Sequence, residues 1–168
     1  MIDLVLAEFE RNKNIFIELY DGIDDDMLYW RRSKNKWCLL EVICHLYDEE
    51  RLDFRFRTQW VLDRPNELPP SFDPADWVEE HQYMVQNGPE MVQKFVEERD
   101  RSIAWLKELK NPNWNNGFDH PKRGRMTGKY LLSNWLAHDY LHIRQILKQK
   151  FDYLKLQSGT DLDYAGVW

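Results

Sequence analysis

Four segments of the sequence place apolar side chains at helical spacing, and this periodicity constrains the fold more than any other feature. Residues 2–21 show it first, because their apolar positions recur at i, i+3, i+4 and i+7, as one buried stripe of a helix requires. Gly22 follows as a natural helix stop. The stripe consists of Ile2, Val5, Leu6, Phe9, Phe16, Leu19 and Tyr20. The segment predicts a first amphipathic helix.

The same spacing predicts a second and a third helix. The second spans about residues 37–62, and Glu41 stands three residues after Cys38 as in a capping box, although a thiol is a weak cap. The third spans about residues 89–109 and starts with a proline, whose missing N–H is harmless in the first turn. Its apolar stripe is interrupted by Arg99, and the sequence offers no reason for this.

The connections decide how these helices are arranged. Residues 63–89 hold five of the seven prolines and predict a long connection, with one short helix beginning at Asp73-Pro74. A loop at residues 111–125 precedes a last helix, residues 127–151, which Thr127 can cap. No strand pattern or internal repeat is visible. We therefore predict an all-α four-helix bundle whose long crossover between helices 2 and 3 lets these two run parallel.

Length and composition predict one domain over residues 1–168, with an irregular tail at about 152–168. The net charge of -6 is spread along the chain, so no footprint for nucleic acid is visible. No apolar stretch approaches the roughly 18 residues of a membrane span. Cys38 and Cys44 fall on different faces of one helix and are expected to stay reduced. We expect a soluble, cytoplasmic protein.

Three histidines lie where helix geometry brings them to the edge of an apolar arc. His138 and His142 are four residues apart, so their side chains differ by about 40 degrees and stack on one face. His45 borders the apolar arc of the second predicted helix in the same way. Three neutral imidazoles leave a fourth position for water, as in catalytic zinc sites. We predict that His45, His138 and His142 bind one divalent metal ion, preferably zinc.

Two other interpretations of these residues are open. One histidine bordering an apolar face is usually a hydrogen-bonded core residue, and an isolated pair at this spacing arises often by chance. The run His138-Asp139-Tyr140-Leu141-His142 also differs by one carbon from the H-E-x-x-H of zinc proteases. The shorter Asp139 and a third histidine upstream argue against that class.

The stretch WCLLEVICHLYDEE at residues 37–50, followed by GRMTGKYLLSNWLAHDYLHIRQI at residues 124–146, resembles the DinB/YfiT-like superfamily of metalloenzymes. The resemblance covers nearly the whole chain. It implies a four-helix bundle in which a helix-borne histidine and an HxxxH pair bind zinc or nickel, and it implies that a homodimer can form. Members commonly have Ser or Thr where this chain has Cys38. This departure weakens the helix cap but leaves the ligands intact.

Two carboxylates are candidate catalytic residues. Asp139 falls in the middle of an apolar arc and must have a partner, because a buried carboxylate is expensive alone. It either orients a ligand imidazole or holds substrate, or it forms a structural ion pair. Glu49, one turn after His45, is a candidate general base for a water or a thiol, unless it is solvated with the acidic run around it. Gln145 projects beside the same pair of histidines.

The resemblance also implies a reaction class. Some relatives are thiol transferases that use bacillithiol, mycothiol or glutathione, so a small-molecule substrate and a low-molecular-weight thiol are expected here. The alternatives are a metal-dependent hydrolase, a non-catalytic metal-binding bundle of the DNA-damage or stress response, and a helical interaction protein without an ion. Thiol and water activation need the same ligands, so the ligands cannot choose between the first two.

Overall fold

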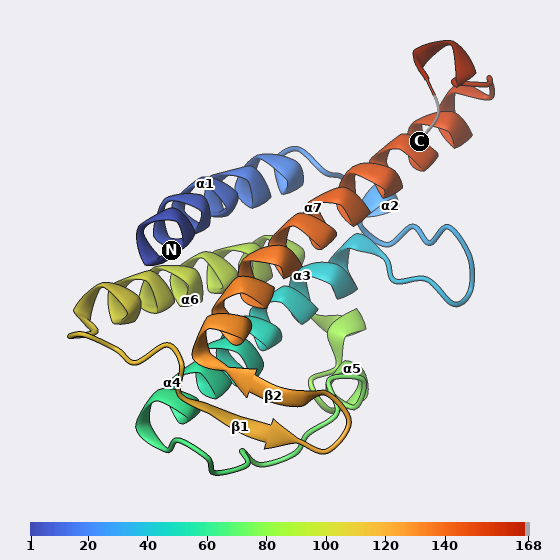
Figure 1. Cartoon of the computed structure of the whole chain (residues 1–168). Coiled ribbons are helices and arrows are strands. Elements are labelled where there is room, and N and C mark those ends of the chain that lie inside the picture. Colours follow the sequence, from blue (N-terminus) through green and yellow to red (C-terminus); the bar gives the residue numbers. More distant parts are fainter. Residues whose placement is uncertain (167–168) are drawn as a thin grey trace.

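Four long helical segments pack side by side in the computed structural model, which describes residues 1–166 (Figure 1). They are α1 (Ile2–Tyr20), a second segment formed by α3 (Leu39–Asp48), η1 (Glu49–Phe54) and α4 (Arg55–Asp63), then α6 (Gly88–Glu108) and α7 (Gly128–Ser158). Shorter helices are α2 (Asp25–Leu28), α5 (Trp77–Glu80), η2 (Tyr83–Val85) and η3 (Asp163–Ala165). The predicted all-α four-helix bundle is confirmed.

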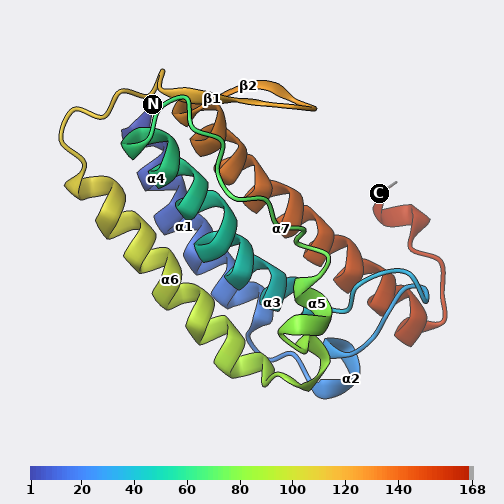
Figure 2. The same cartoon turned by 90° about the horizontal axis from the view of Figure 1, so that it is seen from below.

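The long crossover sets the direction of the helices. After α4 the chain returns along the bundle through α5 before α6 begins, so α6 runs parallel to α3–α4 while α1 and α7 run the opposite way (Figure 2). Helix α6 packs against both α1 and α3, and α7 packs against α1, α3 and α4. The predicted crossover between the second and third long helices is confirmed. No described helix combines the length and apolar content needed to cross a membrane.

The expectation that the chain contains no strands is wrong. Strands β1 (Gly117–His120) and β2 (Gly124–Thr127) form an antiparallel hairpin at one end of the bundle (Figure 1). Phe118 pairs with Met126, and both are buried against Val61 and Leu131. Strands of four residues are too short for an alternating pattern to stand out in the sequence. The hairpin forms because the end of the bundle offers its two apolar side chains a place to pack.

The predicted irregular tail begins too early, because α7 continues beyond Phe151 to Ser158. Gly159 ends it in the left-handed conformation that suits glycine at this position, with φ of 62°. The ring of Tyr153 packs on Trp30 with centroids 5.4 Å apart. This contact with a distant loop supports the extra turns. Residues 167–168 of the predicted tail lie outside the described residues.

A π-helical segment interrupts the second long helix one turn after His45. Segment η1 spans Glu49–Phe54 between α3 and α4. The side chains of Glu49 and Glu50 are both buried there, with relative exposures of 6% and 2%. The expectation that this acidic run is a wet face is therefore wrong for both residues. Such wider turns are frequent at functional sites, and this one accompanies the burial of two consecutive carboxylates.

The predicted capping box of α3 is present in both halves, from the Cys38 side chain and from the Glu41 side chain. The Glu41 carboxylate accepts the backbone N–H of Cys38 at 2.8 Å and also pairs with Arg31 at 2.7 Å. A carboxylate at this position satisfies a donor that the start of the helix would leave unpaired. The start of α3, and with it His45, is therefore anchored to the preceding loop.

Arg99, which interrupts the apolar stripe of α6, lies at the centre of a buried polar network. It is 1% exposed, and its guanidinium donates to both carboxylate oxygens of Glu50 at 2.8 Å and to both of Asp139 at 2.6 and 2.8 Å. Asn12 donates to Asp139 at 3.1 Å, and the Trp135 indole donates to Glu50 at 2.8 Å. Each charge is thus paired and hydrogen-bonded, which makes its burial tolerable.

We expect Arg99→Ala to lower the free energy of unfolding by about 3–5 kcal/mol, because it leaves two buried carboxylates without a cation. Urea denaturation followed by circular dichroism measures this change. Arg101→Ala is the matched control, since the Arg101 side chain is 65% exposed and its ion pair with Glu98 is worth less than about 1 kcal/mol. Equal losses in the two variants would contradict the structural role of Arg99.

Candidate metal centre

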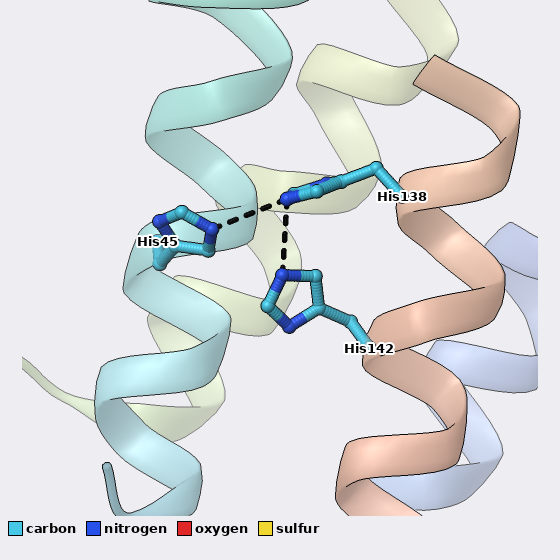
Figure 3. A group of neighbouring side chains, drawn as sticks. All are labelled: His45, His138 and His142. Atoms are coloured by element: carbon cyan, nitrogen blue, oxygen red, sulfur yellow. Dashed lines mark hydrogen bonds between the residues drawn. The ribbon is translucent and has the colours of Figure 1, made fainter. Parts of the chain in front are cut away.

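Three imidazole rings converge between α3 and α7 (Figure 3). The Nε2 atom of His138 lies 3.3 Å from that of His45 and 3.0 Å from that of His142. Each residue offers one ring nitrogen to a group whose ligand atoms all lie within 4.8 Å of one another. The structure thus brings together the three histidines that the sequence predicts as metal ligands.

The two helices contribute to this cluster in different ways. His138 and His142 lie one helical turn apart on α7, and their rings meet edge to face with centroids 4.3 Å apart. His45 joins them only because α3 packs against α7, and its ring lies 4.9 Å from that of His142. The spacing within α7 alone brings His138 and His142 together. The position of the His45 ring depends on how α3 and α7 are rotated against each other.

The geometry of the cluster fits a small divalent cation. In a tetrahedral site with Zn–N bonds of about 2.0–2.1 Å, two ligand nitrogens stand roughly 3.3–3.4 Å apart, close to the separations found here. The Nδ1 atom of His45 is buried without a hydrogen-bond partner. A cation between the three Nε2 atoms would use their facing lone pairs and place the remaining proton of each ring on Nδ1. The residues present therefore fit a metal ion.

The electrostatics also suit metal binding. Burial lowers the pKa of His45 to about 3 and that of His142 to about 4, because a charged imidazolium loses its hydration there. Burial and then the neighbouring imidazoles lower the pKa of His138 to about 2. All three rings are neutral near pH 7, which is the form that binds a metal.

Two aromatic rings that the sequence did not single out wall the cluster. The Trp37 ring lies 4.8 Å from His45, and the Phe54 ring lies 5.0 Å from His138. Trp37 precedes α3 and Phe54 ends the π-helical segment. A regular α-helix drawn through His45 does not place either ring beside the histidines. The sequence spacing therefore could not predict that they contact the cluster. Together they limit the access of water to the rings.

Glu49 lies behind His45 rather than in front of the cluster. Its Oε1 atom is 3.9 Å from Nδ1 of His45, on the edge of the ring opposite the converging Nε2 atoms. Burial, with a contribution from Asp53, raises the pKa of Glu49 to about 8. Glu49 makes no hydrogen bond to the ring at this distance, and a shift of about 1 Å would make it the partner that orients His45. Its role as a general base stays a prediction.

Asp139 has the partners that its predicted burial requires. It is fully buried, and its two oxygens are bound by Arg99 and Asn12. The structural ion pair, one of the two interpretations of Asp139, is the one that these contacts support. A catalytic role for Asp139 stays a prediction.

The two loop histidines, His81 and His120, lie apart from the cluster. Nδ1 of His81 is 2.6 Å from Asp48, and the ring of His120 accepts the backbone N–H of Lys122 in the hairpin turn. Gln145 lies beside His142 in the wall of an open groove of ≈ 640 Å³. The predicted position of Gln145 near the histidine pair therefore agrees with the structure.

Comparison with known proteins identifies the same architecture. The sequence model of the DinB superfamily matches residues 8–146. Among solved structures, the fold is similar to that of YfiT from Bacillus subtilis, described as a probable metal-dependent hydrolase with an unusual four-helix bundle topology. The TM-score is 0.79 at 19% sequence identity, over 95% of this chain and 89% of that one. No curated protein matches significantly.

We expect the untagged protein to bind one zinc ion per chain and to gain thermal stability from it. At a free zinc concentration of 100 times Kd, linkage adds about 2.7 kcal/mol to the free energy of unfolding. His142→Ala removes a ligand and should abolish this gain, measured by calorimetric titration and by thermal melting. His120→Ala, outside the cluster, is the control. A stabilisation that survives in His142→Ala would exclude this site.

Glu49→Ala separates two roles for this carboxyl group. If Glu49 orients the His45 ring, the variant should bind zinc roughly 10–100-fold more weakly, as is usual when the partner of a ligand is removed. Competition against a chelating indicator measures the affinity, and Glu108→Ala on the exposed end of α6 is the control. An unchanged affinity combined with a lower reaction rate would instead support the general base.

Proposed function

The chain belongs to the DinB superfamily, whose model covers most of its length, and from this premise we propose that it is a metal-dependent enzyme acting on small molecules. The observation that carries the proposal is the convergence of three neutral imidazoles, two of them buried and that of His138 half-buried, on one point. No carboxylate or thiolate of residues 1–166 joins this group. Three protein ligands with an open fourth position are typical of catalytic rather than structural sites.

Zinc is the ion that we propose, with nickel as the second candidate. Imidazole nitrogens suit both ions, and the separations between the Nε2 atoms agree with a tetrahedral zinc site. Three neutral ligands leave the full positive charge of the ion uncompensated, so that it would lower the pKa of a thiol or a water bound to it.

We propose thiol-dependent S-transfer as the reaction. In such a transfer the thiolate sulfur forms a bond to an electrophilic carbon, the leaving group departs with the old bonding pair, and the thiol proton passes to solvent. A free thiol has a pKa of about 8.5, against 15.7 for water, so it needs less help from a base. This suits a site in which the candidate base, Glu49, lies behind His45 and has a raised pKa.

The residues around the cluster would support this reaction in distinct ways. Trp37 and Phe54 would exclude water from the histidines that they cover, which favours a thiolate over competing hydrolysis. Glu49 would hold the His45 ring in its orientation. Asp139 would act at a distance, by fixing the turn of α7 that carries His138.

Hydrolysis is the second candidate function, and the description of YfiT as a probable metal-dependent hydrolase favours it. The same three histidines would serve it. A non-catalytic stress-response bundle or an interaction protein has less support, because the cluster of three histidines is complete and an open groove reaches it.

The zinc-loaded protein should conjugate a low-molecular-weight thiol to a chromogenic electrophile, and His45→Ala should slow the reaction by at least about 100-fold, because it removes transition-state stabilisation. Thiol loss and product absorbance measure the rate with cysteine, glutathione and other small thiols, beside ester and amide substrates. His81→Ala is the control. Zinc-dependent ester cleavage without thiol conjugation would replace the transferase by a hydrolase, and activity unaffected by His45→Ala would exclude the site.

A further inference from the structure

The groove beside the metal centre has an unusual charge. Its lining includes the basic residues Arg32, Lys36, Arg144 and Lys148, and no lining residue is a carboxylate. We call it the cationic groove. The chain as a whole carries a net charge of -6, so four cations around one hollow are an exception to its surface. A concentration of like charge in a concave site raises the local concentration of ligands of opposite charge.

The cationic groove leads directly to the histidine cluster. His142, one of the three converging rings, forms part of its lining. Trp37 also lines it and packs against His45 at 4.8 Å. Farther along α7, Gln145 and Gln149 follow His142 at helical spacing and continue the same wall. A molecule lying in the groove therefore has one end beside the histidines and the other among the basic side chains.

The wall opposite α7 is held in place by specific contacts. It is the loop of residues 30–37, between α2 and α3. Gln149 donates to the backbone carbonyl of Trp30 at 2.8 Å, and Arg32 lies 2.6 Å from Asp152 of α7. The groove is thus built by two elements that are tied together, as expected of a preformed ligand site.

The basic side chains differ in how far they are neutralised. Arg32 and Lys148 share one carboxylate, that of Asp152. Among residues 1–166, Lys36 and Arg144 have no side-chain ion pair and both are exposed. Even when Asp152 is counted, the groove has more basic side chains than carboxylates. Lys36 and Arg144 are free to pair with a ligand.

We propose that the cationic groove binds the anionic end of the substrate, whose reacting end lies at the metal centre. This inference rests on the proposed function and narrows its substrate class to small molecules carrying carboxylate, phosphate or sulfonate groups away from the reacting atom. The volume of ≈ 640 Å³ matches a small molecule, since such sites span about 300–1,000 Å³. Lysine and arginine side chains are the usual partners of these anions.

The surroundings of Trp37 sharpen this assignment. On its other side lies a second hollow, lined by Asp76, Glu79 and Glu80 and by no basic residue. An anion is repelled there and attracted in the cationic groove. The two hollows therefore predict a direction for the substrate, with its charged end along α7.

Cobalt(II)-loaded protein provides the test, because thiolate binding changes the visible spectrum of the ion without requiring turnover. The probes are three thiols of similar size and different charge: 2-mercaptoethanesulfonate, 2-mercaptoethanol and cysteamine. At low salt we expect wild type to bind 2-mercaptoethanesulfonate at least about tenfold more tightly than 2-mercaptoethanol, as charge-assisted hydrogen bonds predict. In Lys36→Gln/Arg144→Gln this preference should fall to about threefold or less.

The matched control is Lys110→Gln/Lys129→Gln, which removes the same charge from exposed positions outside the groove and should keep the wild-type preference. If wild type shows no preference for the anionic thiol, or if the groove variant retains that preference, the proposal is overturned. If no thiol alters the cobalt spectrum, the proposed thiol chemistry is wrong, but the anion-binding role of the groove is still open to a separate test.

In that test succinate is titrated into the metal-free protein, and NMR follows the signals of the Trp37 indole and the Gln145 amide. Signals that shift in wild type and not in the groove variant support the proposal. If the signals do not shift in wild type, the proposal is overturned.

Discussion

An arginine buried between two carboxylates is the constraint on which the rest of this structure depends. Arg99 of α6 binds Glu50 of η1 and Asp139 of α7, while Asn12 of α1 completes the shell of Asp139. All four long helical segments therefore contribute to one network. Buried charged side chains cannot move far from one another, because separating them leaves a desolvated charge without its partner. The network thus fixes the rotation and the height of the helices relative to one another.

The metal centre depends on this network through its neighbours in the chain. Asp139 follows His138, so the pair with Arg99 holds the turn of α7 that presents the ring. On the opposite helix, the π-helical segment buries Glu50 toward Arg99 and Glu49 toward His45. Two adjacent carboxylates thereby serve different purposes: one neutralises the core cation, and the other stands behind a candidate ligand.

Electrostatics divide the region around the cluster into parts with separate roles. The histidines are neutral because burial disfavours their charged forms, which keeps their lone pairs available. The positive side chains are placed along α7 and the loop before α3, where they are hydrated and can exchange water for an anion. A site of this kind separates the group that activates a substrate from the groups that recognise it, so variation in the groove can change specificity without altering the ligands.

The sequence by itself determined the four helices, the long crossover, the shared face of His138 and His142 and the need of Asp139 for a partner, because helical periodicity and the cost of burial are local properties. Only the tertiary structure decided that the partner is Arg99, that the π-helical segment turns Glu49 inward, and that α7 extends past Phe151. The hairpin and the cationic groove were likewise out of reach of the sequence. The strands are too short to show an alternating pattern, whereas the groove joins the loop before α3 to α7, which meet only when packing fixes how one helix is rotated against another.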